Sequence, residues 1–140
     1  MRFMIIVKAT PDSEAGRFPP NPEPLFQAMA TYHEELARAG VLLDASGLQP
    51  SSKGWRVQFD GNKRTVIDGP FTESKELIAG YTMIQTRTRD EAIEWSRRFP
   101  NPVGEGASCH VEVRQLFEME DFGGILEEQT AERFRSIGVQ

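Results

Sequence analysis

The chain has 140 residues, of which 39% are hydrophobic and 26% charged, a composition ordinary for one soluble globular domain. Its net charge is −5, which argues against nucleic acid or an anionic membrane as a partner, because either would need a basic face. No apolar run has the length of a membrane span, the first residues lack a secretory signal pattern, and the single cysteine, Cys109, fits a reducing compartment, so we expect a cytoplasmic protein.

The first part of the chain predicts a strand, a loop and a helix. Residues 3–7 form a continuous apolar run typical of a strand buried on both faces, and a proline-rich loop is predicted over residues 10–24. An Asn-Pro-Glu start predicts a helix over residues 22–38, and Gly40 is placed to end it in the left-handed conformation. The residues expected to pack this helix on a sheet recur at helical spacing: Leu25, Met29, Tyr32 and Leu36.

The second part predicts a hairpin between further strands and a second helix. Residues 55–59 alternate between apolar and polar side chains, the pattern of a strand with one buried face, and the Asp-Gly pair at 60–61 indicates a hairpin turn. Thr88 and Glu91 form a capping box at the start of a helix. The remaining strands are predicted to begin at residue 41 and to span residues 64–67, 81–86 and 111–114.

This order predicts an α+β fold of ferredoxin-like sandwich type, with an antiparallel sheet, two helices on one face and an inserted hairpin. The other face of the sheet is then left bare. Its apolar side chains require a cover, and a second copy of the chain is the simplest one, so we expect a homodimer. For residues 118–140 an amphipathic helix is expected to dock on the body or on the partner subunit, and a frayed tail is the alternative.

Residues 68–76, DGPFTESKE, form a charged corner between two β-branched runs. This stretch, followed by Ile-Ala-Gly-Tyr, resembles the signature of the DGPF branch of the YCII-related family. Weaker matches support it in chain order, at residues 2–7, 39–42, 47–51, 90–95 and 111–114. The resemblance covers residues 1–117, with residues 118–140 as an extension, and implies a protein similar to the dimeric α+β barrels, in which two sheets pack together.

The sequence predicts neither a cofactor nor a metal site. Two histidines and one cysteine occur without metal-ligand spacing, and no nucleotide-binding glycine pattern or nucleophile elbow is present. Cys109 and His110 are adjacent on a strand and point to opposite faces, which excludes them as a nucleophile pair.

His33 and Asp68 are the candidate catalytic residues. His33 lies at the border between the inner and outer faces of the first long helix, and a carboxylate that orients an imidazole makes a general base near neutral pH. The resemblance implies a His–Asp pair in a cleft of the dimer, with Asp68 inside the matching motif. The alternatives are a partly buried surface histidine and a turn-capping aspartate.

Four further residues are candidate ligand-binding groups. Lys75 and Arg114 could attract an acidic substrate, and Phe71 and Tyr81 could line a pocket, while solvated cations and core aromatics are the alternatives.

Three functions follow from these observations. The first is the binding of a small organic molecule in a cleft of a homodimer. The second is a cofactor-independent lyase or isomerase using His33 and Asp68, since a dehydrochlorinase of chlorinated hydroxyquinols is similar in fold to this family. The third is a regulatory interaction module, because DGPF proteins resemble products often encoded beside extracytoplasmic-function sigma factors.

Overall fold

A computed structural model describes residues 1–138 of the chain. The strands are β1 (Arg2–Lys8), β2 (Leu42–Gly47), β3 (Trp55–Asp60), β4 (Lys63–Asp68), β5 (Ile78–Gln85) and β6 (Val111–Gln115). The helices are α1 (Pro11–Glu14), α2 (Glu23–Arg38), α3 (Arg89–Arg97) and α4 (Glu128–Ser136), with 3₁₀ turns at Ser51–Lys53, Ser74–Glu76 and Met119–Phe122.

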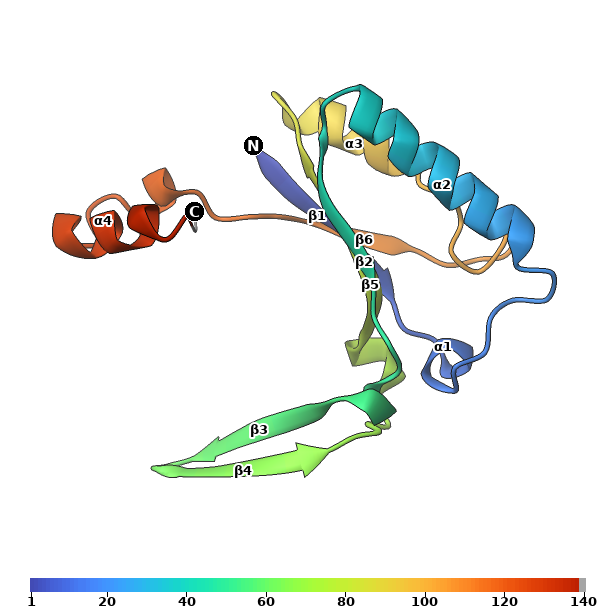
Figure 1. The fold of residues 1–140 in the computed structure, drawn as a ribbon, viewed down its shortest axis with the longest axis horizontal. Helices are drawn as coiled ribbons and strands as arrows, with labels where there is room; N and C mark the ends of the chain where they lie inside the picture. Colours follow the sequence, from blue (N-terminus) through green and yellow to red (C-terminus); the bar gives the residue numbers. More distant parts are fainter. Residues whose placement is uncertain (139–140) are drawn as a thin grey trace.

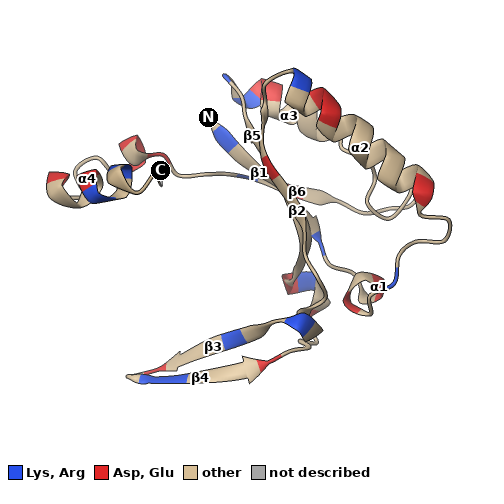
Figure 2. Cartoon of the chain, in the orientation of Figure 1, with Lys and Arg blue, Asp and Glu red and all other residues tan. Residues whose placement is uncertain are grey.

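Four strands form an antiparallel sheet in the order β2-β5-β1-β6, and α2 and α3 lie together on one of its faces (Figure 1). Each helix follows one strand and precedes another, so both connections return the chain to the same side of the sheet. This confirms the predicted α+β fold of ferredoxin-like type. The charged positions of α2 lie near its two ends and are mostly acidic, whereas α3 carries both signs (Figure 2).

The core lies between the two helices and the covered face of the sheet. Tyr32 and Leu36 of α2 pack against Ile5 of β1 and Ile84 of β5, which are fully buried, and Ala92 of α3 completes the contact. The Tyr32 hydroxyl donates a hydrogen bond to the carbonyl of Trp95 at 2.7 Å. Burial of this phenol raises the pKa of Tyr32 to about 12, because the charged form cannot be solvated there.

On the opposite face of the sheet, no helix of residues 1–138 packs as α2 and α3 do on the first. We call this the open face and define it by Met4 and Ile6 of β1 and Tyr81 and Met83 of β5, which pair across the two strands. All four side chains are half-buried in the protomer. The bare apolar face expected from the sequence is therefore present.

The hairpin differs from the expectation. β3 and β4 pair only with each other as a separate two-stranded sheet, and every residue of both strands is exposed, whereas one face was predicted to be buried. The hairpin projects from the main sheet toward the side of the open face, away from α2 and α3 (Figure 1). Its apolar side chains therefore have no layer of the same protomer to pack against.

The predicted loop over residues 10–24 contains a short helix. The side chains and backbones of Thr10 and Ser13 form a reciprocal capping box that holds α1. Asn21 does not cap the next helix as expected: it has a φ of 50°, Pro22 occupies the N-cap position, and no side chain caps α2. Gly40 has a φ of 72°, as predicted for a residue that ends the helix.

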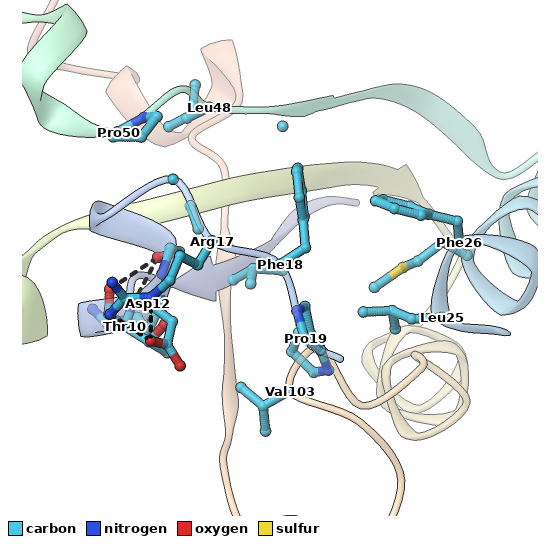
Figure 3. Close-up of a pocket in the computed structure, with 18 of the residues that line it drawn as sticks. Thr10, Asp12, Arg17, Phe18, Pro19, Leu25, Phe26, Leu48, Pro50 and Val103 are labelled. Atoms are coloured by element: carbon cyan, nitrogen blue, oxygen red, sulfur yellow. Dashed lines mark hydrogen bonds and ion pairs between the residues drawn. The ribbon is translucent and has the colours of Figure 1, made fainter. Parts of the chain in front are cut away.

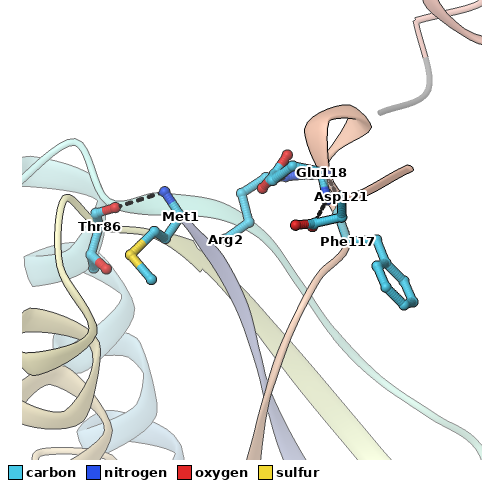
Figure 4. Close-up of polar contacts among 6 residues, drawn as sticks. All are labelled: Met1, Arg2, Thr86, Phe117, Glu118 and Asp121. Carbon is cyan, nitrogen blue, oxygen red and sulfur yellow. Dashed lines mark hydrogen bonds and ion pairs between the residues drawn. The ribbon is translucent and has the colours of Figure 1, made fainter. Parts of the chain in front are cut away.

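The segment after β6 is tied to the start of the chain (Figure 4). The Met1 amino group donates to the Thr86 carbonyl at 3.0 Å, and Arg2 Nε pairs with the Glu118 carboxylate at 2.9 Å. The Glu118 amide in turn donates to Asp121 at 2.7 Å. Beyond this anchor, α4 lies on the open-face side of the sheet (Figure 1). Across residues 1–138 no helix is both long and apolar enough to cross a membrane.

The buried phenol of Tyr32 predicts a loss of stability at high pH. Between pH 10 and about pH 12 the unfolded chain releases this proton while the folded chain keeps it, so the free energy of unfolding should fall by up to about 2–3 kcal/mol. Below pH 10 both states are protonated and the group adds no pH dependence. Urea unfolding of the wild type and Tyr32→Phe across this range isolates the effect, because the variant keeps every other titrating group. If the unfolding free energies of the two proteins changed equally with pH between 10 and 12, the prediction would be wrong.

Candidate functional site

Two adjoining cavities lie along α2 on the covered side of the sheet. The larger, of about 730 Å³, opens between α2 and the α1 segment, and Figure 3 shows Phe18, Leu25 and Phe26 around it with Leu48 and Val103 beyond. The smaller, of about 400 Å³, continues toward the edge strand β2. They share five lining residues and are described together as the α2 cleft; the shared residues are Val7, Phe26, Met29, Gly47 and Ala79.

The larger cavity is lined mainly by aliphatic, aromatic and proline side chains. Its polar end carries Thr10, Asp12 and Arg17, the last two joined at 2.9 Å (Figure 3). Both side chains of this ion pair are largely exposed, so water screens it and it contributes little to stability. The cleft is thus an apolar space with one charged end.

His33 lines the smaller cavity, and both its ring nitrogens are engaged. Nδ1 lies 2.7 Å from the Met29 carbonyl oxygen, and Nε2 lies 2.8 Å from the Thr82 hydroxyl. A carbonyl oxygen can only accept, so Nδ1 carries the proton of the neutral ring. Nε2 is then an acceptor, and the buried Thr82 hydroxyl donates to it.

These contacts orient the His33 ring without a carboxylate. The Tyr32 and Phe99 rings lie nearly perpendicular to the imidazole, with centroids 5.4 and 6.3 Å from its own. An imidazole whose tautomer is set by a backbone carbonyl presents Nε2 as a weak base or a hydrogen-bond acceptor. Here that nitrogen faces Thr82 at the wall of the α2 cleft.

The structure does not bring Asp68 to His33 within one protomer. Asp68 is exposed at the end of β4, where it pairs with Trp55, and it is absent from the residues that line the α2 cleft. His33 contacts the covered side of the sheet, whereas the hairpin projects on the other side (Figure 1). Within this protomer Asp68 therefore does not orient the His33 imidazole.

The corner around Asp68 is a tightly packed junction. The Gly69 amide donates to the Gly54 carbonyl at 3.0 Å, and a Cβ at Gly69 would lie only 1.9 Å from the carbonyl oxygen of Ser51. The Ser51 hydroxyl accepts from the Phe71 amide at 2.9 Å, and the Ser51 amide and hydroxyl both donate to the Glu14 carboxylate. The motif thus joins the base of the hairpin to the Ser51–Lys53 turn and to α1.

The other candidate residues occupy three different places. Phe71 lies under the Arg56 guanidinium, 3.8 Å from the ring centroid, and Lys75 is exposed on the neighbouring turn. Tyr81 borders the smaller cavity from β5, but its side chain lies on the open face, where its hydroxyl donates to Asp44 at 2.9 Å. Arg114 is exposed on β6 and pairs with Glu112 at 3.3 Å. Of the six candidates, only His33 and Tyr81 line the cleft.

Sequence reasoning missed Thr82 and the Met29 carbonyl. Helical spacing could have predicted the contact with Met29, because this residue precedes His33 by one turn and its carbonyl is within reach of the His33 side chain. Strand alternation carried the signal for Thr82, which lies on the face opposite to Tyr81 and therefore beneath α2. Within residues 1–138 there is no cluster of three metal-ligating side chains.

The chain is similar to proteins of one family. The model of the YCII-related domain matches residues 1–119. The uncharacterized protein R00369 of Rhizobium meliloti (strain 1021) is 25% identical over 96 residues, which are 69% of this chain and 77% of that protein. Among solved structures, 5-chloro-2-hydroxyhydroquinone dehydrochlorinase (TftG) of Burkholderia phenoliruptrix AC1100, in complex with 2,5-dihydroxybenzoquinone, has a TM-score of 0.43 at 16% identity, covering 84% of this chain and 94% of that one.

The close approach at Gly69 predicts that Gly69→Ala destabilises the protein. The added methyl group would meet the Ser51 carbonyl at 1.9 Å, so the junction must shift, at a cost of about 3 kcal/mol in unfolding free energy. Chemical denaturation measures the change. Gly47→Ala, on β2 where no atom lies within 4 Å of a new Cβ and φ is not left-handed, is the matched control. A loss for Gly69→Ala no larger than that for Gly47→Ala would contradict the packing argument.

Proposed function

The chain belongs to the YCII-related domain family, and on that premise we propose that it binds a small organic molecule in the α2 cleft and works as a homodimer. The observation that carries the proposal is His33 Nε2, held as an acceptor at the wall of an apolar cleft. Small-molecule sites are typically apolar cavities of about 300–1,000 Å³ with a few oriented polar groups. The two cavities of the cleft, of about 730 and 400 Å³, have that size and character.

The cleft suggests the chemistry of the ligand. Its lining is mainly apolar, and His33 and Thr82 supply one acceptor and one hydroxyl at its inner end. A compact ring bearing a hydroxyl group fits this arrangement, because the ring can be buried while the hydroxyl donates to Nε2. The ligand then replaces Thr82 as the donor to that nitrogen, and the Thr82 hydroxyl turns to a new acceptor.

A cofactor-independent lyase or isomerase is the second candidate, favoured by the same tautomer. Nε2 would take a proton from the substrate, and the Met29 carbonyl would continue to accept from Nδ1 in the resulting imidazolium. In a dehydrochlorination, the electron pair of the broken C–H bond forms the new double bond and chloride leaves with the C–Cl pair. Asp68 of the partner subunit is the proposed carboxylate near this cation.

The amount of exposed surface supports the homodimer. The chain has an accessible surface of 10240 Å², whereas a compact monomer of 15.8 kDa is expected to have about 7300 Å². The excess is about 2900 Å² in one copy and about 5800 Å² in two, which is at the upper end of the total area that obligate homodimers bury. The open face is the apolar surface that a second copy would cover.

The regulatory module is a third hypothesis, with a surface of its own. Phe134 and Ile137 at the end of the chain are 42% and 70% exposed, as a protein-docking patch near α4 would require. We expect the protein to act in the cytoplasm, a prediction that rests on its single cysteine.

His33→Phe should weaken ligand binding by about tenfold or more, because the variant keeps an aromatic ring but loses the acceptor at Nε2. The measurement is ligand-observed NMR with a set of phenols and hydroxylated quinones, followed by titration of the best binder. His110→Phe, at the exposed second histidine, is the matched control and should leave binding unchanged. Undiminished affinity in His33→Phe would refute the assignment.

The same set of compounds separates binding from catalysis. If the second candidate is correct, chlorinated members should release chloride in the presence of the wild-type protein, and His33→Phe should abolish that release. If chlorinated compounds bind but none releases chloride, the lyase function is refuted and only the binding function remains.

The wild-type protein should sediment as a dimer at micromolar concentration, because its excess exposed surface needs a partner. Analytical ultracentrifugation gives the mass directly. Met83→Glu, which places a carboxylate on the open face, should shift the protein toward the monomer, whereas Glu94→Gln on the outer side of α3 should not. A wild-type monomer would overturn the homodimer.

A further inference from the structure

One face of the β3–β4 hairpin is mainly apolar and lies open to solvent. Trp55, Val57 and Phe59 alternate along β3, and Val66 pairs with Val57 across the two strands, so all four share a face. The charged residues of this face lie at its two ends: Asp68 pairs with Trp55 at the base, and Arg64 pairs with Phe59 near the tip, its guanidinium 4.7 Å from the ring centroid. Trp55, Phe59 and Val66 are each 64% exposed. We call the four apolar side chains the hairpin face.

The opposite face of the same hairpin is polar. It carries Arg56, Gln58, Thr65 and Lys63, with Ile67 as its single large apolar side chain. Charged positions on the hairpin are separated by uncharged stretches in Figure 2. The two strands are therefore amphipathic in the manner of an element that packs on another layer, although no such layer exists among residues 1–138.

A hairpin of this kind is not expected to be stable in water alone. Isolated two-stranded hairpins are marginal and need a further strand or a packed face. The junction at Gly69 fixes the base of the hairpin, and Arg56 on the polar face contacts Phe71 and Glu73, but every residue of both strands remains exposed. An exposed apolar surface of several aromatic and β-branched residues marks an interaction site.

The occupant is a second copy of this chain. The hairpin projects on the same side of the sheet as the open face, so two copies that pair through their open faces carry their hairpins alongside one another's bodies (Figure 1). The excess accessible surface of about 2900 Å² exceeds the roughly 800 Å² per partner of a standard interface, so it is large enough for a contact that includes both the open face and the hairpin.

We propose that the β3–β4 hairpin is a dimerisation arm whose hairpin face, Trp55, Val57, Phe59 and Val66, packs on the second copy. This inference rests on the homodimer of the proposed function and adds to it a second contact, outside the open face. The arm stabilises the pair by burying two aromatic side chains, the residue class that dominates binding energy at protein interfaces. Polar side chains on its outer face then remain in water.

The experiment compares substitutions on the two faces of one hairpin. Trp55→Thr with Phe59→Thr removes the aromatic area and keeps a residue suited to strands, whereas Gln58→Thr with Lys63→Thr makes the same replacement on the polar face. Dimer dissociation constants come from analytical ultracentrifugation, and circular dichroism confirms that each variant is folded. We expect the first pair to weaken the dimer about 100-fold or more and the second pair by less than threefold.

Tryptophan fluorescence supplies a second measurement. Subtracting the spectrum of Trp55→Phe from that of the wild type isolates Trp55. Its accessibility to acrylamide should be high in the diluted monomer and low in the dimer.

The outcomes separate this inference from the proposed homodimer. A wild-type dimer that both pairs of substitutions leave intact, that both pairs weaken equally, or in which Trp55 stays accessible to acrylamide overturns the arm and leaves the pairing of open faces standing. Such a result would free the hairpin face for a different protein. A wild-type monomer overturns the arm and the homodimer together.

Discussion

A sheet has two faces, and this chain supplies helices for only one of them. Tyr32 and Leu36 of α2 close the covered face against Ile5 and Ile84, and that contact forms the hydrophobic core of the protomer. The open face, the hairpin and the α2 cleft are all positioned by this two-layer body. Because the second face cannot be covered from within, the exposed surface of the protomer is far above that of a compact chain of its mass.

The elements were predictable where local chemistry and periodicity agree. The apolar run of β1, the stripe of α2 and the Thr88 cap each depend on neighbouring residues, and all three lie where expected. The burial of the hairpin was predicted wrongly for a definite reason. Alternation in β3 shows that one face is apolar, but it carries no information on whether the covering layer belongs to the same chain.

The candidate site was predictable only in part. His33 was identified from its position at the border of the α2 stripe, and the structure places it on the cleft. Its orienting group within the protomer is the Met29 carbonyl, a backbone atom that no residue pattern reveals. The role of the motif at Asp68 could not be deduced, because the contact between Gly69 and Ser51 joins segments whose approach depends on the folded hairpin.

The close approach of the Gly69 backbone to the Ser51 carbonyl has a consequence for the association of two copies of the chain. Since a side chain at this position has no room, the two strands leave the body in a direction that is set before any encounter. A hairpin held in a fixed orientation loses little conformational entropy when it binds another surface. More of the contact energy then contributes to affinity. The absence of a side chain at Gly69 thus preorganises the hairpin for association, at a place outside the α2 cleft.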